Sequence, residues 1–314
     1  MKVIIISGAT ATGKTDLSIK MAKEIDGEVV NFDSLLLYRE LNIGTAKPTP
    51  QERGEIPHHM IDVSSISSPM NAADYVKEAL PIIQNILSKN KTPILVGGSG
   101  FYLQALLMGM YDSPTSSSEV LQRSKTLYDN EGILPFRLIL KENDLVSYER
   151  YHENDHYRIR RAVEHFWTTG SSLSQERLKK DQDNIKNQLT NIHGWETLHI
   201  YLKVPKEDHI PIIEKRTSRM IDEGLLDEVG SLLKNGFTGL EKPLQSIGYK
   251  EALSYLNGHF KTMDECIEKI IISTRQLAKS QKTWFNRISQ KEIFNPLLDS
   301  RIIEDKIKNF LKER

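Results

Sequence analysis

The sequence predicts an α/β fold in which a parallel sheet is flanked by helices and interrupted by an all-α insertion domain. Three observations predict it. Short apolar, β-branched segments alternate with helix-periodic segments through the first 108 residues. A glycine-bounded loop follows the first apolar segment directly. A charged, helix-prone stretch without strand signals separates this region from one further apolar segment near residue 200.

The strands are predicted from short apolar runs that end in turn residues. The run KVIIIS is continuous and rich in β-branched residues, which is typical of a strand buried on both faces of a parallel sheet. The helices are predicted where apolar residues recur at helical spacing, as Leu17, Met21 and Ala22 do. We expect strands at residues 2–7, 28–32, 59–63, 93–96 and 198–204. We expect helices at residues 16–25, 72–88, 101–108, 210–223, 225–234, 249–256 and 263–288.

Two polar segments mark the domain boundaries. DSPTSSSE follows Tyr111, and QDNIKNQLTN precedes the last predicted strand. Between them the chain is charged and helix-prone. We therefore expect a core with C-terminal helices from residues 1–111 and 196–314, and a helical insertion from residues 112–195.

The composition excludes several classes of protein. The chain has 314 residues, 39% of them hydrophobic, which is enough to bury a substantial core. Cys266 is the single cysteine, so an internal disulfide and a cysteine-based zinc site are excluded. Lys and Arg (42) balance Asp and Glu (42), which argues against a generic DNA coat but permits a local basic groove. The N-terminal apolar run stops at Gly8, so we expect no signal peptide, no membrane contact and a cytoplasmic location.

The loop after the first strand has the pattern G-x-x-x-x-G-K-[ST]. Its glycines allow backbone N–H groups to surround an anion, and the following helix adds its positive dipole end. The lysine supplies a charge, and the last hydroxyl can hold Mg²⁺. The pattern predicts a P-loop NTPase-like core with a polyphosphate site, for which ATP or GTP is the default occupant and a small-molecule kinase the default function. The loop residues are Gly8, Ala9, Thr10, Ala11, Thr12, Gly13, Lys14 and Thr15.

Asp33 ends the second predicted strand and should therefore lie at the carboxyl edge of the sheet, close to this loop. A carboxylate there could ligate magnesium or act as a general base toward an acceptor. It could also be an N-cap or turn aspartate with no chemical role.

Seven motifs in order make the sequence recognisable. They are GATATGKT, DSLLLYRELNIGTAKPT, PHHMID, GGSGFY, ENDHYRIRRAVE, IGYKEA and STRQLAKSQKTW. They extend from residue 8 to residue 284, and the whole chain resembles the bacterial-type tRNA dimethylallyltransferases, also called tRNA isopentenyltransferases.

The resemblance implies transfer of a dimethylallyl group from its diphosphate to N6 of the adenosine 3′-adjacent to the tRNA anticodon, with release of diphosphate. The phosphate loop then holds the donor diphosphate, with Mg²⁺ on Thr15. Asp33 matches the family's catalytic aspartate, and Arg216 matches an arginine that approaches the diphosphate. Without the resemblance, the residues around Arg216 favour a surface arginine on an amphipathic helix. Ser99 keeps the hydroxyl where most members have threonine.

The same resemblance implies contacts to the anticodon stem-loop from the core and from the insertion, by a protein that we expect to be a monomer. Two positions depart from the family pattern: Leu121 falls where the family has an arginine, with Arg123 two residues later, and Ser280 replaces a second arginine. The implied tRNA-binding residues are Asp33, Ser34, Leu35, Leu36, Arg123, Tyr157, Arg158, Arg161, Arg275, Lys279 and Lys282.

Three other functions stay open from the sequence. The same chemistry could act on free adenine nucleotides, although the basic insertion and C-terminal helix argue against this. The phosphate loop could belong to a small-molecule kinase. The protein could also be a non-catalytic RNA-binding module in which the loop is only a structural anion site.

Overall fold

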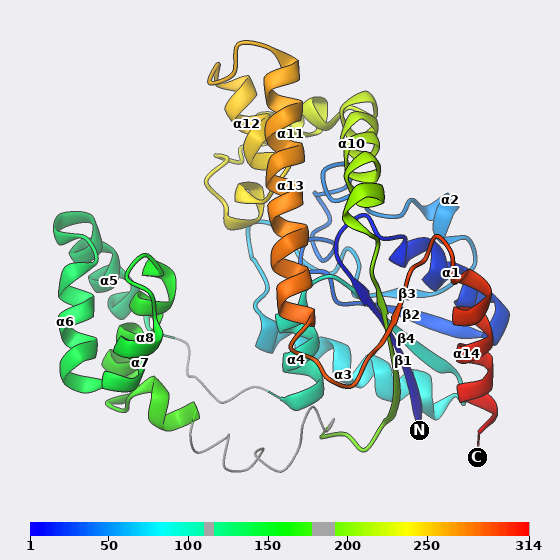
Figure 1. Cartoon of the computed structure of the whole chain (residues 1–314). Helices are drawn as coiled ribbons and strands as arrows, with labels where there is room; N and C mark the ends of the chain where they lie inside the picture. Colours follow the sequence, from blue (N-terminus) through cyan, green and yellow to red (C-terminus); the bar gives the residue numbers. More distant parts are fainter. Residues whose placement is uncertain (110–115, 178–191, 314) are drawn as a thin grey trace. The chain divides into compact units, whose positions relative to one another are not determined.

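The computed structural model describes residues 1–109, 116–177 and 192–313 (Figure 1). The chain divides into two compact units, which we call the core unit (Met1–Gly109 with Leu189–Arg314) and the insertion unit (Met110–Gln188). The predicted linker at residues 182–191 lies outside the described residues, as does part of the one at 112–119.

A six-stranded parallel sheet forms the centre of the core unit and confirms the predicted α/β fold (Figure 1). The strand order is β3-β2-β4-β1-β5-β6, so β1 lies between β4 and β5. The strands are β1 (Lys2–Gly8), β2 (Gly27–Asn31), β3 (His58–His59), β4 (Thr92–Gly97), β5 (Glu196–Leu202) and β6 (Glu292–Phe294).

Two features of the sheet differ from the prediction. The strand expected at residues 59–63 is wrong: β3 contains only His58 and His59. Met60 and Asp62 have φ values of 58° and 60°, and this left-handed backbone cannot continue a strand. The edge strand β6 was not predicted, because three residues are too few to show a periodicity.

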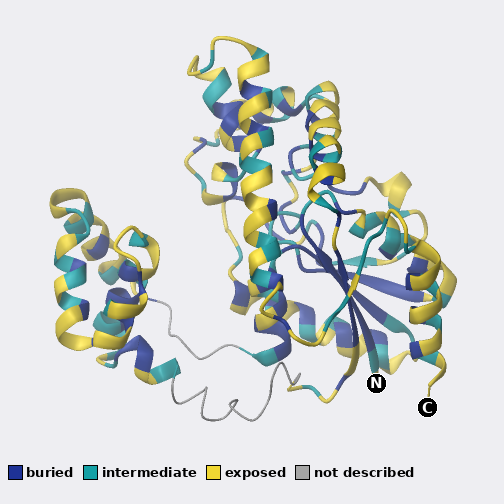
Figure 2. Ribbon diagram, viewed as in Figure 1, coloured by how far each residue is buried: buried dark blue, intermediate teal, exposed yellow. Residues whose placement is uncertain are grey.

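Helices cover both faces of the sheet, as the alternation along β1 requires. Ile4 and Ile6 pack beneath α1 (Lys14–Ile25) and α14 (Ser300–Lys312). Val3 and Ile5 pack on the opposite face, in one cluster with residues of α3 (Ala72–Ser88) and α4 (Gly100–Met108). The strands are accordingly among the most buried parts of the unit (Figure 2).

Four helices extend beyond the carboxyl edge of the sheet (Figure 1). The first three are α10 (Lys206–Asp222), α11 (Leu225–Lys234) and α12 (Tyr249–Leu256). The fourth, α13 (Met263–Phe285), has 23 residues and joins two cores: Ile270 packs with α11 and α12, whereas Phe285 packs under the sheet. Neither α13 nor any other helix in the described part of the chain is long and apolar enough to cross a membrane.

The loop after β2 is anchored by these helices. Tyr38 and Leu41 are buried in the same cluster as Val229 of α11 and Tyr249 of α12. A short helix, α2 (Pro50–Arg53), follows this loop. The segment that carries Asp33 is therefore fixed at one end by the sheet and at the other by the C-terminal helices.

The insertion unit consists of helices in its described part, as expected. Phe136, Leu140, Ile159 and Val163 form its core. Arg160 is part of this packing: its guanidinium lies 4.5 Å from the ring centre of Tyr128 and donates to the Ser124 hydroxyl. Its described part includes the helices α5 (Ser118–Glu131), α6 (Leu134–Asn143), α7 (Leu145–Arg150) and α8 (His156–Thr169).

The packing of α13 on α4 gives a test of the fold. A Cβ added at Gly100 would lie 2.1 Å from the Trp284 ring. Gly100→Ala is therefore expected to lower the free energy of unfolding by about 1–3 kcal/mol, the usual effect of overpacking. Chemical denaturation followed by circular dichroism measures it.

Gly230 is the matched control, because it lies within α11 and a Cβ there meets nothing within 4 Å. Gly230→Ala is expected to stabilise the protein by about 0.5–1 kcal/mol through helix propensity. Equal unfolding free energies for the two variants would contradict the described contact between α13 and α4.

Candidate functional site

The glycine-bounded loop lies at the centre of the carboxyl edge of the sheet, between the end of β1 at Gly8 and the start of α1 at Lys14. The helix begins at Lys14, earlier than the predicted residue 16. Gly13 has a φ of 78°, a left-handed backbone that favours glycine and turns the chain into the helix. The first N–H groups of α1 are left without intrahelical partners, as an anion site requires.

A pocket opens beside this loop. Its floor is one face of the sheet, with Asn31 paired to Val96 in the register of β2 and β4. The first turns of α1 and the segment after β2 form its sides, and α10 contributes Arg216. The lining residues are Thr10, Lys14, Thr15, Ser18, Val29, Asn31, Asp33, Leu36, Thr45, Ala46, Pro48, His58, Ile61, Val96, Gly97 and Arg216.

Two cations in this pocket have no carboxylate within 4 Å among the described residues. Lys14 donates only to the carbonyl of Ala9, at 2.7 Å. Arg216 donates to the Thr10 hydroxyl at 3.0 Å and to the Thr45 carbonyl at 3.2 Å. Burial lowers the pKa of Lys14 to about 8 and also lowers the pKa of Arg216, while Asp33 acts in the opposite direction on both. Asp33 is thus a more distant counter-charge and forms no direct ion pair with either cation. Two desolvated cations beside one carboxylate form an electrostatic environment that favours a bound anion.

Asp33 follows β2 and lines the same pocket. Asn31 fixes its backbone: the Asn31 Oδ1 accepts from the Asp33 N–H at 2.8 Å, and the Asn31 Nδ2 donates to the Asp33 carbonyl at 2.9 Å. One carboxylate oxygen accepts from the Leu35 N–H at 3.2 Å, so Asp33 closes a turn and does not cap a helix. Asp33 therefore both closes this turn and lines the pocket.

Ser99 holds the segment next to Asp33. Its hydroxyl accepts from the Ser34 N–H at 3.0 Å and donates to the Ser34 hydroxyl at 3.2 Å. Ser99 is not among the residues that line the pocket, whereas Leu36 is. Leu35 packs against the apolar cluster that Tyr38 and Leu41 form with residues of α11 and α12.

Sequence reasoning missed the residues that fix this site from behind. Glu228 of α11 accepts from the N–H groups of Asn42 and Ile43, at 3.2 and 2.9 Å, and from the hydroxyl of Tyr249. These contacts hold the backbone next to Thr45, whose carbonyl orients Arg216. No local pattern around Glu228 distinguishes it from a solvent-facing glutamate.

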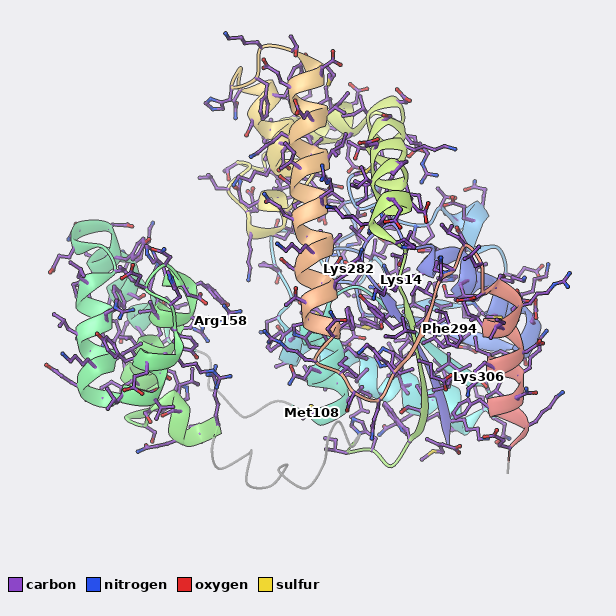
Figure 3. All side chains as sticks on the ribbon, in the orientation of Figure 1. Lys14, Met108, Arg158, Lys282, Phe294 and Lys306 are labelled. Carbon is purple, nitrogen blue, oxygen red and sulfur yellow. The ribbon has the colours of Figure 1, made fainter. Side chains whose placement is uncertain are left out.

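A groove of about 630 Å³ lies between α10 and α13. The predicted tRNA-binding residues Arg275, Lys279 and Lys282 all line it, and α10 adds Lys206. Figure 3 marks Lys282 on α13 and Lys14 at the sheet edge. The floor includes Ile210, Ile213, Ile272 and Ala278, and no acidic residue is part of the lining. A basic rim over an apolar floor suits a nucleic-acid strand with unstacked bases.

The predicted residues of the insertion unit lie on two helices. Tyr157 and Arg158 of α8 are exposed, and Arg158 pairs with Asp155 one turn earlier (Figure 3). Arg161 pairs with Glu164 at 2.9 Å. Arg123 of α5 is stacked on Trp167, with its guanidinium 4.0 Å from the ring centre, while Leu121 is exposed.

The oxygen ligands available for a metal are few. No group of three or more His, Cys, Asp or Glu side chains occurs among the described residues. The pocket offers the Thr15 hydroxyl and the Asp33 carboxylate. This set fits Mg²⁺, which keeps most of its waters and binds through one or two protein oxygens together with substrate phosphates.

Known proteins resemble this chain over most of its length. A sequence model of the family described as IPP transferase matches residues 36–288. A tRNA dimethylallyltransferase of Geotalea uraniireducens is 39% identical over 296 residues, covering 91% of this chain and 90% of the relative. One of Thermotoga neapolitana is 35% identical and covers 100% of this chain and 97% of the relative.

Solved structures show the same fold. A tRNA isopentenylpyrophosphate transferase from Staphylococcus epidermidis has 32% identity and a TM-score of 0.69, and the match covers 100% of this chain and 99% of that one. A eukaryotic dimethylallyltransferase acting on tRNA has 28% identity and a TM-score of 0.79, with 98% of this chain and 80% of that chain covered.

The pocket electrostatics predict the effect of removing a cation. The folded state lowers the pKa of Lys14, so at pH 7 the charged lysine opposes folding. Lys14→Met is therefore expected to leave the melting temperature of the unliganded protein unchanged or higher. The same variant should lose the stabilisation by magnesium pyrophosphate, which for the unsubstituted protein is about 2.7 kcal/mol at a ligand concentration of 100 Kd.

Thermal unfolding with and without magnesium pyrophosphate measures both effects. Lys23→Met is the control, because Lys23 is an exposed residue of the same helix. A ligand-induced shift that survives in Lys14→Met would place the anion site elsewhere.

Proposed function

The chain belongs to the IPP transferase family, and from that premise we propose that it transfers a dimethylallyl group from dimethylallyl diphosphate to N6 of the adenosine 3′-adjacent to the anticodon of tRNA. The observation that supports this most is the pocket in which Lys14 and Arg216, two cations without carboxylate partners, lie with Asp33. This combination serves a reaction in which an anion leaves and a proton must be accepted.

The donor diphosphate is proposed to bind at the N–H groups of the loop, Lys14 and Arg216. The allylic C–O bond breaks, its electron pair goes to the diphosphate, and the adenine N6 forms the new bond to carbon. An exocyclic adenine amine is a weak nucleophile, so the main barrier lies in the departure of the leaving group. Fixed N–H groups and cations stabilise the negative charge that develops on it.

Asp33 is proposed as the general base. It accepts a hydrogen bond from the N6 amine and then the proton that the amine loses on alkylation. The contacts from Asn31 and Leu35 keep this carboxylate at the pocket without neutralising it, since neither partner is a cation. Ser99 is proposed to support the same segment through Ser34.

Mg²⁺ is proposed as the metal of the site, held by the Thr15 hydroxyl together with the diphosphate. It would supply further charge stabilisation to the leaving group. Thr15, which would hold Mg²⁺, and Lys14 both lie in the first turn of α1. The metal ion and the lysine would therefore act at the same end of the donor.

The anticodon stem-loop is proposed to bind along the groove between α10 and α13 and on α8 of the insertion unit. The target base must leave the loop stack, which costs a few kcal/mol and is easiest in a single-stranded loop. Ser34, Leu35 and Leu36, next to Asp33, would contact the RNA there. All proposed residues come from one chain, and we therefore propose a monomer that acts where tRNA is located, in the cytoplasm.

One assay separates this function from the alternatives. The protein is incubated with Mg²⁺ and labelled dimethylallyl diphosphate, together with tRNA, with AMP, or with ATP and small acceptors. Label in tRNA supports the proposal, and label in AMP indicates a free-nucleotide prenyltransferase. Phosphoryl transfer without prenylation indicates a kinase, and RNA binding without any turnover indicates a binding module.

Asp33→Asn tests the general base. The asparagine can still accept from the Leu35 N–H but cannot take up a proton. Turnover is expected to fall by about 10²–10⁴-fold while donor binding is retained. Single-turnover kinetics and calorimetry with pyrophosphate measure the two quantities.

Asp26→Asn, at a side chain that is 83% exposed, is the control for this variant. Turnover of Asp33→Asn within two-fold of the unsubstituted protein would remove Asp33 from the role of base.

The groove predicts a salt dependence. Arg275→Ala combined with Lys279→Ala should weaken tRNA binding and reduce the slope of log Kd against log salt by about 1.4–1.8, since each phosphate contact contributes about 0.7–0.9. Filter binding at several salt concentrations measures the slope. Lys308→Ala, on α14 at the far face of the sheet, is expected to leave it unchanged. An unaltered slope in the double variant would exclude phosphate contacts at the groove.

A further inference from the structure

Thr10 is the residue of the phosphate loop with the most contacts to distant parts of the chain. Its N–H, its carbonyl and its hydroxyl each meet a side chain from α10 or α13. Arg216 is one of the three and already belongs to the proposed site. We propose that the other two, Gln281 and His209, are positioning residues that hold the loop in its anion-binding conformation. This inference rests on the proposed function, because it assumes that the loop binds the donor diphosphate.

Gln281 connects the loop to the turn that carries Ser99. Its Oε1 accepts from the Thr10 N–H at 2.8 Å, and its Nε2 donates to the Gly98 carbonyl at 3.1 Å. A Cβ at Gly98 would lie 2.5 Å from that Nε2, so the glycine permits the approach. Gln281 thereby fixes the ends of two neighbouring strands, β1 and β4, relative to one another.

His209 holds the other polar backbone group of Thr10, its carbonyl. Its Nε2 lies 2.8 Å from the Thr10 carbonyl, and a carbonyl can only accept, so the Nε2 carries the proton and donates. The side chain is 3% exposed. Burial lowers the pKa of His209, against the raising effect of the hydrogen bond to Thr10, and Lys282 and Lys14 lower it further.

The conformation of the loop explains why it needs such support. Ala11, the next residue, has a φ of 60°, a left-handed backbone that costs a non-glycine residue roughly 1 kcal/mol or more. Gln281 and His209 fix both polar groups of Thr10 and so determine how the chain enters Ala11. The Thr10 N–H, being occupied by Gln281, is not offered to the ligand. Neither Gln281 nor His209 lines the pocket beside the loop, so both reach it through Thr10. His209 also lines the groove between α10 and α13, whereas Gln281 does not.

The test compares three variants with two controls. Gln281→Met and His209→Leu remove the hydrogen bonds at similar volume, whereas His209→Gln keeps a donor at the position of Nε2. Calorimetry with magnesium pyrophosphate gives the donor-site Kd, and steady-state kinetics give KM for dimethylallyl diphosphate and for tRNA. Gln104→Leu and His259→Leu are controls at exposed side chains outside the site.

Gln281→Met and His209→Leu are expected to raise the Kd for pyrophosphate and the KM for the donor about ten-fold each, the scale of one or two lost hydrogen bonds. In Gln281→Met, which leaves the groove lining intact, the KM for tRNA should stay within two-fold. His209→Gln should restore most of the donor affinity. A merely structural role would change both KM values together or only the melting temperature.

Two results would overturn the inference: a pyrophosphate Kd within two-fold of the unsubstituted protein in both removal variants, or equal defects in His209→Gln and His209→Leu. A failure of the proposed function is distinguishable, because then the unsubstituted protein itself would not bind pyrophosphate or prenylate tRNA.

Discussion

The site of the core unit depends on keeping two cations, Lys14 and Arg216, in one pocket with Asp33 but without a direct ion pair to any carboxylate of the described residues. Like charges at the edge of a sheet repel one another and lose solvation, so the fold must hold them by other means. Lys14 is held by the loop itself, through the Ala9 carbonyl. Arg216 comes from a helix some two hundred residues later in the chain and is held by Thr10 and by Thr45. The site is therefore completed only when α10 packs against the loop, and folding of the C-terminal helices is part of forming the anion site.

The segment after Asp33 extends this dependence. Glu228 accepts two of its backbone N–H groups, and Tyr249 donates to the same carboxylate. These contacts place the Thr45 carbonyl, which in turn orients Arg216. Glu228 thus contributes to the site through neutral donors, and among the described residues it forms no ion pair with Lys14 or Arg216. The arrangement keeps the electrostatic preference for an anion that a phosphate-binding site needs.

Those parts of the fold and the site that depend on local pattern could be predicted from the sequence. The strand, loop and helix from Lys2 to Ile25, the parallel sheet and the helical insertion follow from periodicity and from glycine placement. The end of β3 could not be foreseen, because the left-handed backbone of Met60 and Asp62 is imposed by tertiary contacts and not by residue type. Helix α14 carried a usable signal, in Ile303, Ile307 and Phe310 at helical spacing. The supporting residues of the site, Gln281, His209 and Glu228, could not be predicted, since each acts on backbone groups far away in the sequence, and nothing local marks such a contact.

Helix α13 shows why those long-range contacts matter for a reaction with two large substrates. Lys279 and Gln281 are two positions apart, which places them about 200° apart around the helix. Lys279 therefore lines the basic groove while Gln281 contacts the phosphate loop. A single rigid helix thus connects the surface proposed for RNA to the loop proposed for the donor. Reaction between two bound groups requires their reacting atoms to be aligned within a fraction of an ångström to an ångström. Connecting both sites through one turn of a helix fixes their separation by backbone geometry, which side chains on separate flexible loops would not achieve.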